Sequence, residues 1–386
     1  MKKIGIGIVG IGAISGIYLD NLTKVFKEVE IMGVCDLIPE RAQKAADEYG
    51  VSIYKDMHEL FADPKVEIVL NLTRPYEHFE VTTAALLAGK HVYSEKPIAV
   101  DMDEAAKLVA LAKDKGLLLG GAPDTFMGAG IQTARRIIDA GLIGDIVGAD
   151  CAMICRGHET WHPDPEFYYK RGGGPMLDMG PYYVTALCNL LGEAKAVMGM
   201  TKKSFDTRLI TSEPHFGETV TVDIDTHLTG CIEFTSGAIA QIVTTFDVHY
   251  SAQARFEVYG TDGTLVVPDQ NTFGGNVLLF RPEESKREKI DPGLLKPEEI
   301  SLYRGYRHMP LMFGYRENSR ALGLADMCKA VATGRAVRAN SDLQMHVLEI
   351  LTSFSKSCKE RKYIELTTKY ERGAPMKNLA MPGILD

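Results

Sequence analysis

The first 120 or so residues (about one third of the chain) alternate short apolar runs with longer amphipathic stretches, and this alternation constrains the fold most strongly. Apolar runs predict strands, and stretches with a 3.6-residue period predict helices. The expected strands are at 4–9, 30–35, 68–72, 91–93 and 117–120. The expected helices are at 12–26, 39–49, 77–88 and 102–115. Such a rhythm predicts an α/β fold with a parallel, doubly wound sheet that has helices on both faces.

After about residue 145 the segments alternate apolar and polar residues and are rich in Val, Thr and Ile, as in a mostly antiparallel sheet. The expected strands are at 145–155, 219–234, 238–248, 254–259 and 277–281, with a hairpin turn at Ser236-Gly237. The expected helices are at 174–191, 317–332 and 343–361, and 284–312 is expected to be irregular. We therefore predict a doubly wound, parallel-sheet domain at 1–122, a largely antiparallel α+β domain at 123–365 and a tail at 366–386. The two late helices are expected to pack back against the main body.

Composition narrows the possible partners. The net charge of −8 argues against a nucleic-acid or membrane-surface partner, because both are polyanionic. No apolar stretch approaches the roughly 18 residues of a membrane helix, and the glycine-interrupted N-terminal run suits a strand better than a signal peptide. Seven scattered cysteines indicate reduced thiols in a cytoplasmic protein.

The segment GIGAISG (10–16) stands between the first expected strand and the first expected helix. Gly10 permits a tight turn, and Gly12 lets the backbone approach a pyrophosphate that faces the amides of the helix. Ala13 and Ile14 belong to the same loop and are expected to contact the cofactor. Ser15 stands where the GxGxxG pattern has its third glycine. The segment predicts a dinucleotide site.

Asp36 follows the second expected strand, where a carboxylate accepts hydrogen bonds from the adenosine ribose hydroxyls. A carboxylate there would repel a 2′-phosphate, so NAD is favoured as the cofactor. Arg41 lies nearby and could stack on adenine, which keeps NADP open as the alternative. The structural alternative is a glycine turn with a solvated aspartate.

The segment SEKPIAV (94–100) follows a strand of the same sheet. Lys96, between Glu95 and Pro97, is expected to lie over the crevice where such sheets bind ligands. Partial desolvation there would lower the pKa of Lys96 towards a range useful for acid–base catalysis. A surface salt bridge between Glu95 and Lys96 is the structural alternative. Thr73 and His78, after the strand at 68–72, are expected at the same edge near the cofactor, although His78 also suits packing at the start of a helix.

The loop at 10–16, the EKP triplet at 95–97 and the GGG-x-x-x-D-x-G stretch at 172–180 resemble the Gfo/Idh/MocA oxidoreductases. The resemblance runs over essentially the whole chain. It implies a Rossmann domain followed by an open-faced sheet, and hydride transfer between NAD and a carbon that bears a hydroxyl in a sugar, glycoside or cyclitol. It also implies a homodimer or homotetramer packed through the open sheet, a catalytic role for Lys96 and a cis bond before Pro97.

Many relatives have an aspartate followed four residues later by a histidine that acts as the acid–base catalyst. Asp178 matches the aspartate, but Tyr182 stands at the histidine position, as in glucose–fructose oxidoreductase. The spacing places both side chains on one face of a helix, where they are expected to bind substrate and act in catalysis. A free phenol titrates at about 10, so Tyr182 needs a nearby cation, for which Lys96 is the candidate. The alternative is a core tyrosine and a helix-capping aspartate.

The polar, aromatic loop at 156–174 precedes this helix and is expected to lie over the crevice. His158 is expected to bind substrate, Trp161 to stack on the sugar or nicotinamide, and His162 to be the alternative acid–base residue. Asp124 is a further candidate for substrate binding. No carboxylate–histidine pattern supports a metal site, and a structured surface excursion is the alternative for the loop.

Three functions fit these residues. The first is an NAD-dependent dehydrogenase, with oxidation at C3 of a glucoside as one candidate reaction. The second is an NAD-dependent glycosidase that uses the cofactor transiently. The third is a sugar or redox sensor without turnover, which the missing histidine favours and the presence of Lys96 and Asp178 opposes.

Overall fold

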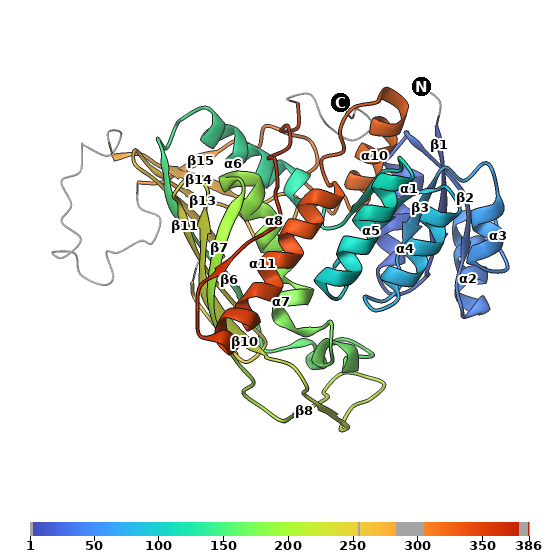
Figure 1. Cartoon of the computed structure of the whole chain (residues 1–386), viewed down its shortest axis with the longest axis horizontal. Coiled ribbons are helices and arrows are strands. Elements are labelled where there is room, and N and C mark those ends of the chain that lie inside the picture. Colours follow the sequence, from blue (N-terminus) through green and yellow to red (C-terminus); the bar gives the residue numbers. More distant parts are fainter. Residues whose placement is uncertain (1–2, 254, 283–304, 378–384, 386) are drawn as a thin grey trace.

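The computed structural model describes residues 3–253, 255–282, 305–377 and 385 (Figure 1). The N-terminal part holds a parallel sheet of five strands in the order β2-β1-β3-β4-β5. The strands are β1 (Ile4–Val9), β2 (Val29–Cys35), β3 (Ile68–Asn71), β4 (His91–Ser94) and β5 (Leu119–Gly121). The chain runs outward from β1 to β2 and returns to β3 on the other side of β1. The carboxyl ends of β1 and β3 therefore flank the switch point where such sheets bind ligands.

Helices cover both faces of this sheet, which explains why every residue of β1 and β3 is buried. The helices of this part are α1 (Ser15–Lys24), α2 (Pro39–Tyr49), α3 (Met57–Ala62), α4 (His78–Leu87) and α5 (Met102–Asp114). The predicted strands and four of these helices are confirmed to within three residues at each end, whereas α3 was not predicted.

Within the described residues, the second sheet has nine strands in the order β15-β14-β13-β12-β6-β11-β10-β7-β16, and only the β6–β11 pair is parallel. The strands are β6 (Ile146–Ile154), β7 (Ala194–Lys202), β10 (His227–Phe234), β11 (Ile239–Thr245), β12 (Phe256–Gly260), β13 (Thr264–Val266), β14 (Val277–Phe280), β15 (Arg307–Met309) and β16 (Ile364–Glu365). The predicted hairpin joins β10 and β11, and Gly237 in its turn has a φ of 88°.

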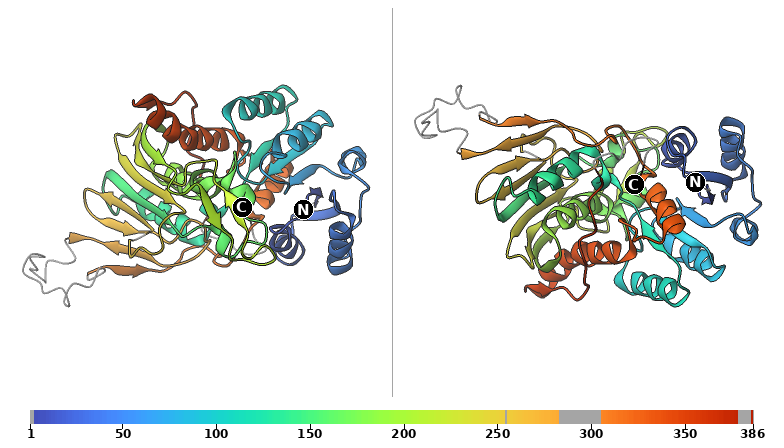
Figure 2. Two further views of the ribbon diagram at one scale, coloured as in Figure 1. Left: turned by 90° about the horizontal axis from the view of Figure 1, so that it is seen from below. Right: turned by 90° about the horizontal axis from the view of Figure 1, so that it is seen from above.

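Helices line one face of this sheet, and the opposite face is open (Figure 2). The covering helices are α6 (Ala129–Asp139), α8 (Gly180–Leu191) and α11 (Ser341–Glu360). On the open face, Met198 and Met200 of β7 and Ile239 of β11 are each more than half exposed. The predicted open-faced, mostly antiparallel sheet is confirmed.

Several element predictions were wrong. The expected strand at 219–234 is two strands, because β9 (Thr219–Thr221) leaves the sheet and pairs with β8 (Thr207–Leu209) in a separate hairpin. The expected helix at 174–191 is interrupted at Met179, which divides it into α7 (Gly174–Asp178) and α8. Pro181 lacks the N–H that a continuous helix would need there.

Helix α6 and strand β7 were not predicted. Gly128 and Gly130 weaken the helical signal at the start of α6, although Ile131, Ala134 and Ile138 carry the expected spacing and are buried. Of the segment predicted to be irregular, 284–312, residues 284–304 lie outside the described residues. The remainder, 305–312, is described and contains β15.

Two late helices join the two sheets. Helix α11 packs on β7 and α8 and also on α5, while α10 (Leu322–Thr333) packs on β5. One hydrophobic core accordingly contains residues from both sheets, from Ile6 in β1 to Ile232 in β10. The domain boundaries at 122 and 365 stay predictions. No helix among the described residues is long and apolar enough to cross a membrane.

Candidate active site

The glycine loop turns sharply between β1 and α1. Gly10 has a φ of 94°, and a Cβ added to it would approach the backbone of Leu72 to 2.9 Å. A Cβ added to Gly12 would meet no atom within 4 Å, so the backbone there faces open space beside the start of α1. Ser15 does not disturb this arrangement, because its hydroxyl donates to the Gly12 carbonyl at 2.8 Å. The loop therefore fits a pyrophosphate.

Asp36 is fixed at the end of β2 by two backbone amides. Its carboxylate accepts from the N–H of Ile11 at 2.6 Å and from the N–H of Ile38 at 2.8 Å. Leu37 is 96% exposed and Ile38 42% exposed, which is unusual for adjacent aliphatic side chains. These two residues would give adenine an apolar surface beside the ribose acid, and their position directly after Asp36 was the signal that the sequence analysis missed.

Lys96 pairs with the second domain. The Lys96–Pro97 peptide bond is cis, as expected. The Lys96 ammonium donates to the Asp178 carboxylate at 2.7 Å and to the Asp178 carbonyl at 2.6 Å. Burial lowers the pKa of Lys96, but the charges of Asp178, Tyr182 and Glu95 outweigh it, and the pKa is raised above its ordinary value. The expected lowering was wrong, because the ion pair stabilises the charged form more than desolvation penalises it.

Glu95 does not form the surface salt bridge that was the alternative for Lys96. Its carboxylate accepts from the hydroxyl of Tyr18 at 2.7 Å and from the backbone N–H of Lys96 at 2.9 Å, and the residue is buried. Glu95 therefore orients the start of the EKP turn and connects it to α1, which carries the glycine loop.

Asp178 also binds His158, which fixes the state of that ring. The His158 Nε2 atom lies 2.8 Å from the Asp178 carboxylate, and the indole N–H of Trp161 donates to Nδ1 at 3.2 Å. Because an indole is only a donor, Nδ1 accepts and Nε2 carries the proton. Burial raises the pKa of Asp178, but Lys96 and His158 outweigh it and the pKa is lowered. Asp178 is thus a carboxylate between a cation and an imidazole.

His162 stands apart from this group. Its Nδ1 accepts from the backbone N–H of Asp164 at 3.0 Å, and its ring packs edge-on against Tyr168. Burial lowers the pKa of His162. In the described chain no hydrogen bond joins His162 to Lys96, Asp178 or Tyr182. The histidine that the loop brings to Asp178 is His158, which was predicted only to bind substrate.

Tyr182 lies in the first turn of α8, directly beyond the helix break, and is 7% exposed. The Lys96 ammonium lies over its ring, 5.3 Å from the ring centroid. The Tyr182 hydroxyl faces a different cation, with Nη2 of Arg320 at 3.5 Å. Arg320 was not predicted, because nothing in the local sequence indicates a contact between residues 138 positions apart.

Three further predicted residues make contacts within the protein. His78 is fully buried, with its ring nitrogens 2.7 Å from the Pro97 carbonyl and 3.0 Å from the Thr73 carbonyl. Asp124 is buried against the N–H of Gly323 at 3.0 Å, and burial raises its pKa to about 6. Both side chains are thus engaged within the protein, and their contacts with a ligand stay predictions. Thr73 remains half-buried after β3, where its hydroxyl donates to Asn71 at 2.6 Å.

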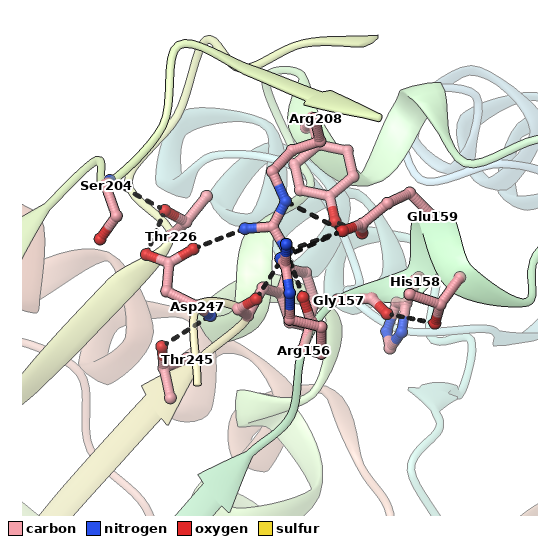
Figure 3. A network of polar contacts seen from close by, with 12 residues as sticks. Arg156, Gly157, His158, Glu159, Ser204, Arg208, Thr226, Thr245 and Asp247 are labelled. Atoms are coloured by element: carbon pink, nitrogen blue, oxygen red, sulfur yellow. Dashed lines mark hydrogen bonds and ion pairs between the residues drawn. The ribbon is translucent and has the colours of Figure 1, made fainter. Parts of the chain in front are cut away.

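A buried ionic network anchors the 156–174 loop (Figure 3). Arg208 of β8 donates to Glu159 at 2.7 and 2.9 Å and to Asp247 at 2.8 Å, and all three side chains are almost completely buried. The same guanidinium binds the Arg156 carbonyl. Since Arg156 and Glu159 flank His158, the network fixes the backbone that presents this histidine. The loop is thus anchored to the site, which the sequence pattern alone did not indicate.

The fold and these contacts define a class of protein. Open space at the glycine loop and an acid at the end of β2 suit a dinucleotide, and a cationic lysine between the two domains suits the oxygen of a substrate. A nucleotide-dependent oxidoreductase combines these features. No group of three or more residues that could hold a metal ion occurs in the described part of the chain.

Comparison with known proteins specifies the family. Residues 4–121 match the model of an oxidoreductase family with an NAD-binding Rossmann fold, and residues 131–266 match the GFO/IDH/MocA C-terminal domain. The chain therefore belongs to the Gfo/Idh/MocA oxidoreductases. NAD as the cofactor is confirmed.

Two relatives and one solved structure illustrate the likeness. An inositol 2-dehydrogenase/D-chiro-inositol 3-dehydrogenase of Lactiplantibacillus plantarum is 38% identical over 36% of this chain, and the match spans only 41% of that enzyme. A 1,5-anhydro-D-fructose reductase of Ensifer adhaerens is 28% identical over 81% of this chain and 92% of its own length. An NAD-binding oxidoreductase of Klebsiella pneumoniae has the same fold, with a TM-score of 0.80 at 20% identity over 95% of this chain and all of that one.

Proposed function

We propose that the protein transfers hydride between NAD(H) and a carbon that bears a hydroxyl in a sugar, glycoside or cyclitol. The observation that carries the proposal is the Lys96–Asp178 ion pair, which joins the cofactor domain to the open-sheet domain beside His158 and Tyr182. The inositol dehydrogenase and anhydrofructose reductase among its relatives support a polyhydroxylated ring as the substrate. Oxidation at C3 of a glucoside is our specific candidate, because the aromatic loop suits a large sugar.

Lys96 is assigned to the reacting oxygen. Two of its three N–H groups point to Asp178 in the described structure, which leaves one to donate to the substrate. Because the ion pair keeps Lys96 charged, it would stabilise negative charge on that oxygen rather than accept a proton. Asp178 holds the ammonium in place, and its carboxylate, oriented by His158, would accept from a neighbouring substrate hydroxyl.

Tyr182 is assigned to the proton. In the oxidative direction, the substrate hydroxyl proton passes to the oxygen of Tyr182 in its phenolate form while hydride leaves the same carbon, so that the alcohol becomes a carbonyl and Tyr182 becomes a neutral phenol. Bound NAD⁺ supplies the acceptor for that hydride. The loop at 10–16 and Asp36 would hold the cofactor, and Trp161, which is 59% exposed, would stack on the sugar or the nicotinamide.

A panel of sugars, glycosides and cyclitols with NAD⁺, followed by the absorbance of NADH, tests this function. We expect net NADH from at least one member of the panel, with 3-keto product from a glucoside. Glycoside cleavage without net NADH would indicate the transient-redox glycosidase instead. Tight binding of NAD and sugar without turnover would indicate a sensor. Either result would contradict the proposal.

We further propose that copies of the chain associate through the open face of the nine-stranded sheet into a dimer or tetramer. The exposed Met198, Met200 and Ile239 support this proposal, because soluble proteins rarely leave such side chains clustered in water.

A further inference from the structure

Arg320 brings a positive charge to the Tyr182 hydroxyl and lies just before α10. Its Nη2 atom is 3.5 Å from the hydroxyl and donates to the Asn271 side-chain oxygen at 2.9 Å. Its Nη1 atom donates to the Asn318 side-chain oxygen at 2.8 Å. Among the described residues, no carboxylate lies within ion-pair distance of this guanidinium. The groups that contact the guanidinium are neutral, and the carboxylates of Glu95 and Asp124 act on it from beyond ion-pair distance.

The backbone around Arg320 is held by the N-terminal domain. The Asn21 amide in α1 donates to the carbonyls of Asn318 and Arg320 at 2.9 and 2.8 Å. Ala321, which follows, is fully buried and has a φ of 80°, a left-handed conformation that a residue with a Cβ rarely adopts. Such a conformation persists where surrounding contacts impose it, which is common near functional sites. The segment is therefore built to place Arg320, and the helix that fixes it also carries the glycine loop.

We propose that Arg320 is the positioning residue for Tyr182: it holds the phenol oxygen and stabilises negative charge on it. The inference rests on the proposed role of Tyr182 as the proton acceptor. Lys96 is less suited to this task, because its ammonium lies over the face of the ring and is already paired with Asp178. A cation beside the phenol oxygen favours the negatively charged form of the tyrosine. A cation that is already paired with a carboxylate favours that form less.

Several titratable groups face Tyr182. Lys96 from the EKP turn, Tyr93 from β4, Tyr168 from the loop and Arg320 all act on it electrostatically. Burial raises the pKa of Tyr93 and of Tyr168, so both ionise later than an ordinary phenol. Burial lowers the pKa of Arg320, but Tyr182, Glu95 and Tyr18 together outweigh it and the pKa is raised, so Arg320 stays charged.

The test follows the ionisation of Tyr182 directly and does not depend on turnover. Protein with ¹³C-labelled tyrosine is titrated by NMR, and the Tyr182 signal is assigned by its loss in Tyr182→Phe. We expect the titration midpoint of Tyr182 to rise by about one pH unit or more in Arg320→Gln, which removes the cation. Arg320→Lys is expected to keep the midpoint near that of the wild type. Arg320→Met supplies a second neutral variant if the glutamine variant does not fold.

Arg316→Met is the matched control, because Arg316 lies in the same segment and binds the carbonyls of Leu311 and Phe313 instead. It should leave the Tyr182 midpoint unchanged. An equal midpoint in the wild type and in both neutral variants would overturn the proposal. A shifted midpoint in an enzyme that oxidises no member of the substrate panel would leave Arg320 in its role and reject the proposed function, so the two failures are distinct.

Discussion

At the scale of single residues, the site depends on which charges are paired and which are not. Asp178 pairs with Lys96 and orients His158, whereas neutral side chains hold Arg320. Lys96, the paired cation, therefore lies over the ring of Tyr182, and Arg320, the cation with neutral partners, lies near its hydroxyl oxygen. Sequence reasoning identified Lys96, Asp178 and Tyr182 from their motifs. It could not identify Arg320 or assign His158 to Asp178, because those contacts depend on how distant segments pack.

Replacing Lys96 by alanine should abolish most of the turnover and leave the cofactor site intact. The variant loses the donor to the reacting oxygen, which typically costs about 10²- to 10³-fold in kcat. The loop at 10–16 and Asp36 lie outside the ion pair, so NADH affinity should change by less than about threefold. Steady-state kinetics and NADH titration check the two expectations. Lys24→Ala, on an exposed lysine of α1, is the control and should behave as the wild type.

Replacing Asp124 by asparagine should stabilise the protein at high pH only. Burial raises the pKa of Asp124 from its usual 3.8 to about 6. The folded state therefore binds this proton more tightly than the unfolded state, and the contribution of Asp124 to stability falls as the pH rises from about 4 to about 6. At 1.36 kcal/mol per pKa unit, the cost at pH 8 is at most about 3 kcal/mol.

Asparagine keeps an oxygen that can accept from Gly323 but carries no charge. Denaturant unfolding should accordingly find Asp124→Asn more stable than the wild type at pH 8 and about equal to it at pH 4. The same difference at both pH values would mean that Asp124 does not titrate in this range.

At the scale of elements, the site is assembled where regular structure stops. The break at Met179 separates Asp178 from Tyr182, so the two are presented by different short helices rather than by one helical face. The Rossmann strands were predictable because burial on both faces makes them continuous apolar runs. The anchoring of the 156–174 loop was not predictable, because it depends on the distant, buried Arg208. The break at Met179, in contrast, had a local signal in Pro181 that was overlooked.

Removing the Arg208 charge should destabilise the loop and the protein together. Arg208→Met would leave Asp247 buried without its cation and Glu159 with only the partly exposed Arg156 at 3.5 Å, and breaking a buried ion pair typically costs about 3–5 kcal/mol. Arg208→Met combined with Glu159→Gln and Asp247→Asn should recover part of that loss, because no buried charge remains unpaired. Urea unfolding, followed by the fluorescence of Trp161, measures the free energy of unfolding of both variants; Trp161 is the one tryptophan of the chain.

The exposed ion pair of Arg171 with Asp101 supplies the comparison. Arg171→Met should change the free energy of unfolding by less than about 1 kcal/mol. A similar small effect for Arg208→Met would show that the buried network contributes little to stability.

At the scale of the whole molecule, the nine-stranded sheet has one covered and one open face (Figure 2). The combined replacement Met198→Glu and Met200→Glu should convert the proposed oligomer into monomers, because it places charges in the centre of the contact. Light scattering after size-exclusion chromatography measures the molar mass of the assembly. Leu209→Glu, at an equally exposed position on the separate β8–β9 hairpin, should keep the wild-type mass. A monomeric wild type would refute the proposed assembly.

The position of α11 between α5 and β7 bears on how such enzymes can be recombined. In a chimaera that took only residues 1–122 from a relative, the surface of the grafted part would not match the retained helices α10 and α11. These late helices belong to the same hydrophobic core as β1. Exchange of cofactor preference between relatives therefore calls for grafting the last third of the chain together with the first.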